Sequence, residues 1–192
     1  MVSKIFQFRK YNLYHVNGGS AATFDISAGV VFKTLCKENL SLCPMAQEKN
    51  RLDSFKRRLE DGHTCLGHVD KKNSTVISYF WVTKSYNAAF DFGLQISVND
   101  NETYIWDCRV NEDSRGQGLY KHGLSEITKR SSNVYIISEQ SNFKSCRAIE
   151  KAGFRKILEF SFVKILKSVF FIANRRVKYI CASSFITLTH FF

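Results

Sequence analysis

The stretch Val110-Asn-Glu-Asp-Ser-Arg-Gly-Gln-Gly-Leu-Tyr120 decides the fold that this sequence predicts, because it joins two segments of different pattern. Residues 104–110 are rich in aromatic and β-branched side chains, which is typical of a strand. Between Leu119 and Ile127, apolar residues recur at helical spacing. The sequence therefore predicts a strand that runs through a polar turn into a helix.

The turn has the features of a phosphate site. Gly116 and Gly118 allow the backbone to approach a ligand closely and to adopt conformations that other residues resist. The N-terminus of the following helix offers unpaired N–H groups and a partial positive charge. Arg115 adds a permanent cation that can grip a pyrophosphate through two hydrogen bonds. Taken alone, R-G-x-G is equally compatible with a plain connection whose glycines only relieve strain.

A second unit follows at a short distance. Val134–Ile137 is a short apolar run that predicts a strand, and the polar residues 138–142 come after it. Residues 143–152 predict a short helix, which is closed by Gly153-Phe154. The chain thus repeats the order of strand, polar turn and helix.

This succession of elements resembles the GNAT acetyltransferase superfamily over roughly residues 104–156. The phosphate loop of that family, Gln/Arg-x-x-Gly-x-Gly/Ala, corresponds here to Arg115–Tyr120. Its second signature corresponds to Asn142, Ser145 and residues 151–154. The resemblance implies an α/β (α+β) fold, in which helices flank a central mixed, twisted sheet and strands four and five are splayed around coenzyme A. It also implies acetyl-CoA-dependent N-acetyl transfer.

The resemblance also implies a set of site residues. Backbone groups of the motif strand would hold pantetheine, the loop would hold the pyrophosphate, and two residues of the second helix would contact pantetheine or cap that helix. The cofactor-binding residues expected on this basis are Cys108, Arg109, Val110, Arg115, Gly116, Gln117, Gly118, Leu119, Tyr120, Asn142 and Ser145.

The catalytic groups are less defined by the sequence. A protonated amine must lose a proton before it attacks, and the candidate bases are Asp107 and Glu139 at the ends of the two splayed strands. Each is as readily a structural carboxylate. Two residues depart from the family pattern: Tyr120 replaces a small residue, and Ile149 stands where many members carry a tyrosine acid. Tyr120 or Tyr104 could protonate the leaving thiolate, and nothing in the sequence favours either.

Composition is compatible with one ordinary domain. The chain has 192 residues, 17 phenylalanines and a single proline, which argues against disorder. We expect an acetyltransferase domain over residues 1–166 and a basic, aromatic tail over residues 167–192. The six cysteines show no paired spacing and predict reduced, mostly buried thiols. The first ten residues have no continuous apolar stretch, so we expect no signal peptide.

The net charge of +11 indicates anionic partners. Coenzyme A accounts for part of it, and we expect no nucleic-acid partner because no such motif is visible. His63, His68 and His122 are not spaced as metal ligands, so we expect them to be structural and expect no metal. A cytoplasmic location and a homodimer are further expectations. The C-terminal residues either form closing strands of the sheet with an irregular end, or lie as a basic, apolar segment on the anionic inner membrane face.

The identity of the acceptor is left open. The R-G-x-G-L-Y variant, the aromatic third strand and the basic tail resemble members linked to surface-polysaccharide assembly, which favours an amino sugar or nucleotide-linked amino sugar. A protein amine is the alternative acceptor. A module that binds coenzyme A without turnover is the alternative from another class.

The remaining segments predict further elements. These are a strand over residues 4–10, a loop over 11–27, one or two helices over 28–42, a helix over 45–59, a hairpin of 63–69 with 75–83, and a strand over 155–167.

Overall fold

The computed structural model describes residues 6–19, 23–48, 51–84, 87–89, 95–165, 168–173, 176–180 and 185–187. The elements follow the chain in this order: β1 (Phe6–Asn17), β2 (Val30–Thr34), α1 (Lys37–Ser41), α2 (Pro44–Gln47), α3 (Leu52–Glu60), β3 (Thr64–Asp70), β4 (Val76–Thr83), β5 (Asn87–Ala89), β6 (Gln95–Ser97), β7 (Glu102–Val110), the 3-10 helix η3 (Glu112–Ser114), α4 (Leu119–Thr128), β8 (Asn133–Glu139), α5 (Phe143–Lys151), β9 (Arg155–Ile165), β10 (Ser168–Ala173), β11 (Arg176–Ile180) and β12 (Phe185–Thr187).

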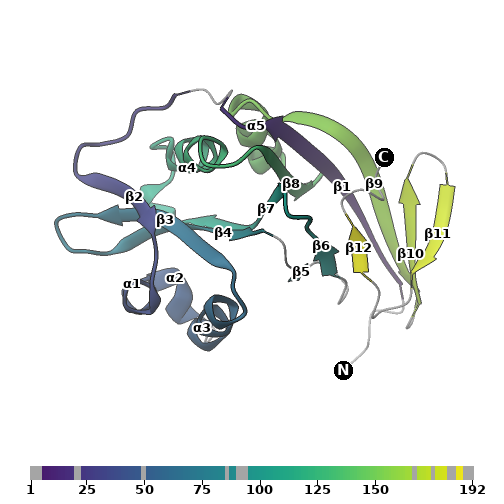
Figure 1. The fold of residues 1–192 in the computed structure, drawn as a ribbon, viewed down its shortest axis with the longest axis horizontal. Helices are drawn as coiled ribbons and strands as arrows, with labels where there is room; N and C mark the ends of the chain where they lie inside the picture. Colours follow the sequence, from purple (N-terminus) through teal and green to yellow (C-terminus); the bar gives the residue numbers. More distant parts are fainter. Residues whose placement is uncertain are drawn as a thin grey trace.

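A twisted, mixed sheet of nine strands forms the centre of the molecule (Figure 1). Its strand order is β11-β10-β9-β1-β8-β7-β4-β3-β2. Within it, β7 and β8 are parallel and the other neighbouring pairs are antiparallel. A small second sheet has the order β12-β6-β5. The predicted fold, a mixed sheet flanked by helices, is confirmed.

The parallel pair opens at the centre of the sheet. β7 and β8 pair only from Glu102–Ile105 to Asn133–Ile136. Beyond that point β7 pairs with β4 up to Val110, and β8 pairs with β1 up to Glu139. The two strands are therefore splayed at their C-terminal ends, and among the described residues one edge of each has no strand partner there.

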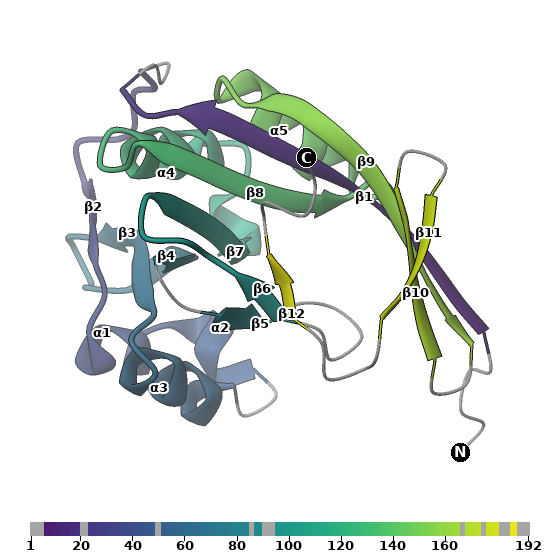
Figure 2. The same cartoon turned by 45° about the vertical axis from the view of Figure 1, so that its right-hand side comes forward.

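Helices cover the two faces of the sheet and bury two separate cores (Figure 2). We call the first the α3-side core; it gathers Phe55, Tyr79 and Trp81 under α1, α2 and α3. The second is the α4-side core, which gathers Phe80 and Leu124 under α4 and α5. Because successive strand residues alternate between faces, one strand such as β4 supplies both cores.

The N-terminal strand is longer than predicted. The sequence suggested a strand ending at Lys10 and a loop after it, but β1 continues to Asn17 and is hydrogen-bonded to β8 and β9 on its two sides. Tyr11, Leu13, Tyr14 and Val16 are all buried. A strand covered on both faces shows no alternation of apolar and polar residues, so the pattern did not reveal it.

Two further predictions need correction. The expected helix over 28–42 is instead β2 followed by the short α1, because Val30–Thr34 pairs with β3. The expected helix over 45–59 is split into α2 and α3, since Glu48 has an extended backbone. The predicted hairpin is confirmed as β3 and β4, and the strand over 155–167 as β9.

Residues after 167 include strands that extend the large sheet. β10 pairs with β9, and β11 pairs with β10. The ring of Phe171 lies 5.4 Å from that of Phe162 and packs against the α3-side core. Phe191 and Phe192, which the predicted tail includes, lie outside the described residues. The division at residue 167 stays a prediction.

Candidate functional site

The predicted phosphate loop lies between the splayed end of β7 and the start of α4. Gly116 has φ +82° and Gly118 has φ +77°, a conformation that L side chains resist. A Cβ atom built on either glycine would meet no heavy atom of the described residues within 4 Å, so these residues leave the space over both open. Gly118 is the N-cap of α4, whose first N–H groups therefore point toward that space. The local geometry suits an anion.

A cleft runs from this loop along the end of β7 to the start of α5. It consists of two adjoining cavities of about 520 and 460 Å³, which together we call the donor cleft. Its lining contains all the cofactor-binding residues that the sequence predicted: Cys108, Arg109, Val110, Arg115, Gly116, Gln117, Gly118, Leu119, Tyr120, Asn142 and Ser145. Residues from two separate motifs are thus brought to one hollow.

The donor cleft is also lined by cations that the prediction omitted. Lys144, Arg147 and Lys151 follow one another at helical spacing on α5 and line the larger cavity together with Arg115. All three are exposed, and the structure gives them no ion pair with a described carboxylate. Arg115 is exposed too and pairs with Glu112 at 3.1 Å. The i, i+3, i+7 spacing of the three α5 cations was a usable signal in the sequence.

Asn142 and Ser145 lie at the start of α5, where one caps the helix and both line the donor cleft. The Asn142 side chain caps α5, since its Oδ1 accepts a hydrogen bond from the Ser145 backbone N–H at 3.2 Å. The Ser145 hydroxyl lies 3.2 Å from the hydroxyl of Tyr120. Both residues line the smaller cavity, so capping holds their side chains at the wall of the donor cleft.

An additional residue in β7 decides which side chains face the donor cleft. Tyr79 pairs with Arg109 and Trp81 with Trp106, so two steps along β4 match three along β7. Asp107 has φ +39°, as a β-bulge residue can. Regular alternation would place Cys108 on the same face as Trp106. The bulge instead sends Cys108 to the donor cleft and the α4-side core, and leaves Asp107 and Arg109 on the α3 side.

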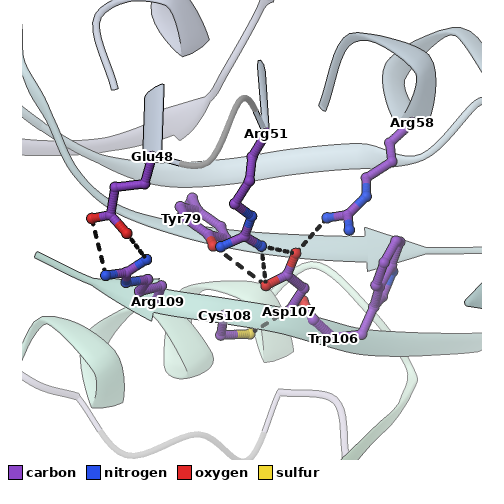
Figure 3. Close-up of polar contacts among 8 residues, drawn as sticks. All are labelled: Glu48, Arg51, Arg58, Tyr79, Trp106, Asp107, Cys108 and Arg109. Carbon is purple, nitrogen blue, oxygen red and sulfur yellow. Dashed lines mark hydrogen bonds and ion pairs between the residues drawn. The ribbon is translucent and has the colours of Figure 1, made fainter. Parts of the chain in front are cut away.

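Asp107 is held by two guanidinium groups on the α3 side (Figure 3). Arg51 donates to its two oxygens at 3.0 and 2.8 Å, and Arg58 donates to Oδ2. The Tyr79 hydroxyl donates to Oδ1 at 3.3 Å. We call this group the arginine clamp. Its charged side chains are between 21% and 28% exposed, so solvent reaches them.

Aromatic rings fix the guanidinium groups of the clamp. Arg58 lies 4.6 Å from the ring centroid of Trp106, and Arg51 lies 5.2 Å from that of Phe55. Such stacking suits arginine and adds to the ion pairs. Burial, and then the charge of Asp107, raise the pKa of Tyr79, so its hydroxyl remains a donor. The clamp joins residues about 50 positions apart, and no local pattern indicated it.

Glu139 ends β8, and the structure shows no ion pair from its side chain to any described residue. Along β8, Tyr135 and Ile137 belong to the α3-side core, and Ser138 faces Cys146 of α5. By alternation Glu139 lies on the α3 side, as Asp107 does. The two predicted bases therefore share a face, although one is clamped and the other is not.

Two histidines that looked unrelated in the sequence are in contact. His68 Nε2 lies 2.9 Å from His122 Nδ1, and His68 Nδ1 lies 2.6 Å from the Ser78 hydroxyl. Burial, and then its neighbour His122, lower the pKa of His68 to about 3. In the described part of the chain no three His, Cys, Asp or Glu side chains are grouped to hold a metal ion.

The cysteines that the structure describes are all free, and Cys43, Cys65 and Cys146 are buried. Cys181 lies outside the described residues. Over the described ranges, every helix is too short or too polar to cross a bilayer.

Comparisons with known proteins give the same fold. A Drosophila protein superposes with a TM-score of 0.58 at 14% identity, over 84% of this chain and 52% of its own. An acetyltransferase of the GNAT family from Colwellia psychrerythraea gives 0.55 at 16%, over 84% and 56%. A GCN5-related N-acetyltransferase from Kribbella flavida gives 0.52 at 9%, over 82% and 58%. The chain thus spans little more than half the length of these structures.

No curated protein sequence matches the chain. The sequence profile described as the acetyltransferase (GNAT) family matches residues 33–154, which include β7, the phosphate loop and α5. That match covers more than half of the chain and ends at Gly153-Phe154, where the second motif ends. This protein therefore belongs to the acetyltransferase (GNAT) family.

Proposed function

We propose that this domain transfers an acetyl group from acetyl-CoA to a primary amine. The observation that carries the proposal is the donor cleft, in which the positive-φ glycine loop, the start of α4 and the open edge of β7 all meet. Coenzyme A has two parts that fit these features. The loop offers N–H groups to its pyrophosphate, and the edge of β7 offers N–H groups to its pantetheine.

The residues of the donor cleft divide between these parts. Arg115 and the N–H groups of Gly116–Tyr120 would hold the pyrophosphate. The backbone of Cys108–Val110 would hold pantetheine and donate to the oxyanion that forms on the thioester carbonyl. Asn142 and Ser145 would contact pantetheine from α5.

The base is one of two carboxylates on the α3 side. Glu139 forms no ion pair with the described residues, whereas the Asp107 carboxylate accepts hydrogen bonds from Arg51 and Arg58. A carboxylate that already accepts hydrogen bonds from two guanidinium groups has less freedom to collect a proton from an amine. We therefore favour Glu139 as the base and keep Asp107 as the alternative.

The α3 side is where the acceptor would approach. The three arginines on this side, Arg51, Arg58 and Arg109, are matched by three carboxylates, Asp107, Glu48 and Glu139, so an acceptor would meet charges of both signs. Our leading acceptor is a nucleotide-linked amino sugar or other amino sugar, as in surface-polysaccharide synthesis, which the R-G-x-G-L-Y variant and the basic C-terminal residues favour. A structure described as a fungal glucosamine N-acetyltransferase region shares the fold, at 10% identity and a TM-score of 0.55. A protein amine is the second candidate.

Turnover of acetyl-CoA with a panel of amino sugars, nucleotide-linked amino sugars and peptides tests the proposal. We expect release of free coenzyme A with at least one amino sugar and little release with peptides. Release with peptides alone would make a protein amine the acceptor. If calorimetry shows coenzyme A binding and no panel member is acetylated, the domain is a binding module and the proposal is wrong.

We also propose a cytoplasmic location with peripheral contact between the C-terminal residues and an anionic membrane. Support comes from the sequence, in which Arg175, Arg176 and Lys178 accompany several phenylalanines. Sedimentation with anionic vesicles at low and high salt tests it, with removal of residues 178–192 as the comparison. Full-length protein that stays in the supernatant at low salt would refute it.

A further inference from the structure

Acetyl transfer leaves a thiolate that needs a proton. When the amine nitrogen bonds to the thioester carbonyl carbon, the tetrahedral adduct collapses and the carbon–sulfur bond breaks. The electron pair of that bond goes to sulfur and forms a thiolate, and an ordinary thiol has a pKa of about 8.5. A proton donor beside the sulfur would lower the barrier of this step. The inference below rests on the proposed function and concerns which residue is that donor.

Most described tyrosines are excluded by their positions. Tyr104 is 2% exposed and belongs to the α3-side core, on the other face of the sheet from the donor cleft. Tyr79 donates to Asp107 in the arginine clamp. Tyr14 is fully buried and its hydroxyl lies 3.1 Å from Asn12. Of the tyrosines whose side chains the structure describes, only Tyr120 lines the donor cleft.

Position 149, where many members of the family carry a tyrosine acid, cannot supply the proton donor here. Ile149 is fully buried in the α4-side core, with no exposure to the donor cleft. A tyrosine at this position would have to displace that core. The proton donor must therefore come from another element.

Tyr120 meets the geometric requirements. It lies in the first turn of α4, and its ring packs 5.7 Å from the ring of Phe80, which fixes its direction. Its hydroxyl reaches across to Ser145 on α5 at 3.2 Å. The same cavity wall includes Cys108 and Val110, the end of β7 that would hold the thioester. Burial, and then the nearby Cys108 thiol, raise the pKa of Tyr120, so the phenol carries its proton at neutral pH.

We propose that Tyr120 is the catalytic acid of this domain. As the carbon–sulfur bond breaks, the Tyr120 hydroxyl gives its proton to sulfur, so coenzyme A leaves as the thiol. The amine proton goes to the base on the α3 side and from there to solvent. The Tyr120 oxygen regains a proton from solvent, with the Ser145 hydroxyl as its hydrogen-bond partner. The sum is acetyl-CoA plus amine giving amide plus coenzyme A.

Cys108 is the competing donor, since its thiol belongs to the same cavity. Its Sγ lies 3.5 Å from the backbone oxygen of Trp106, toward which the S–H donates. Burial raises the pKa of this thiol as well. The S–H is therefore directed at its own strand, whereas the Tyr120 hydroxyl is directed across the cleft.

Tyr120→Phe removes only the hydroxyl and keeps the ring against Phe80. We expect it to lower kcat by on the order of 10²-fold while the Kd for coenzyme A, measured by calorimetry, changes little. Tyr135→Phe, on the α3 side, is the matched control and should keep wild-type kcat. A fluorotyrosine at position 120 has a more acidic phenol, so the alkaline limb of the pH profile of kcat should move to lower pH.

Each outcome decides the matter. An active wild-type enzyme with unchanged kcat in Tyr120→Phe would overturn the proposal while the acetyltransferase function stands. An unmoved alkaline limb in the fluorotyrosine enzyme would overturn it too, because a merely structural hydroxyl would not set that limb. Loss of kcat in Cys108→Ser, with normal kcat in Tyr120→Phe, would assign the proton to Cys108. A wild-type domain without any turnover would refute both the function and this role.

Discussion

The donor cleft and the arginine clamp lie on opposite faces of the same strand, and they are built in opposite ways. The donor cleft comes from two stretches, each continuous in the sequence, at residues 108–121 and 142–151. The clamp joins Arg51, Arg58, Tyr79 and Asp107, which come from three distant segments. Anion recognition by a loop can be encoded locally, because backbone N–H groups of neighbouring residues do the work. A side-chain network depends on the whole fold.

We expect the largest effect on coenzyme A binding from a change in the donor cleft, which is encoded locally in the sequence. Gly118→Asp should abolish coenzyme A binding, because it puts a negative charge into the open space over the loop and a side chain at φ +77°. Calorimetry measures the binding. Gly118→Asn is the matched control: asparagine tolerates this φ and is neutral, so binding should be weakened and still detectable. Equal affinities for wild type and Gly118→Asp would mean that coenzyme A does not bind over this loop.

The two carboxylates of the α3 side should separate in their response. We expect Glu139→Gln to lower kcat by on the order of 10²-fold with coenzyme A affinity retained, as loss of a base does. Asp107→Asn loses ion pairs to Arg51 and Arg58 instead, so its kcat should fall less and its unfolding midpoint should drop. Steady-state kinetics and thermal unfolding of both variants provide the comparison. The reverse pattern would make Asp107 the base, and normal kcat in both would leave proton removal to water.

The His68–His122 contact can be used to test whether the α4 side of the sheet, on which the donor cleft lies, also depends on residues distant in the sequence. Folding lowers the pKa of His68 to about 3, so between pH 6.5 and 3 the unfolded chain binds more protons than the native one. Stability is therefore complete above pH 6.5 and is lost as the pH falls, by about 2 kcal/mol at pH 5. Urea unfolding at pH 7 and pH 5 measures this loss. His68→Gln keeps hydrogen-bonding capacity without titrating, so the loss should shrink in that variant; an unchanged slope would contradict the assignment.

The smallest effect concerns the cations on α5. Arg147→Ala removes one exposed charge from the wall of the donor cleft, so we expect the KM for acetyl-CoA to rise about two- to fivefold at low salt and less at high salt. Lys129→Ala, at the end of α4 and paired with Glu126, is the control and should leave KM unchanged. Equal responses in both variants would mean that the domain responds only to net charge.

The same contrast explains what could be predicted from the sequence. The strand–loop–helix units of β7–α4 and β8–α5 are marked by turn glycines and helical spacing, and both were predicted. β1 was cut short because burial on both faces removes alternation, and β2 was mistaken for a helix because its identity depends on pairing with β3. Asp107 was predicted as a candidate base and Arg109 as a cofactor-binding residue, but the sequence did not reveal that both side chains lie on the α3 side. That placement follows from the bulge, in which Asp107 has φ +39°.

The bulge at Asp107 has a consequence for how such a domain can diverge. Side chains alternate between the two faces of a strand, so the additional residue of the bulge moves every later side chain of β7 to the opposite face. Deleting one residue between Ile105 and Val110 would exchange the two faces for part of the strand, so that the clamp and the donor cleft would be lost together. No single substitution would restore the lost alternation, because a substitution does not change the number of residues. The length of this segment therefore constrains how the domain can change, whichever residues occupy its positions.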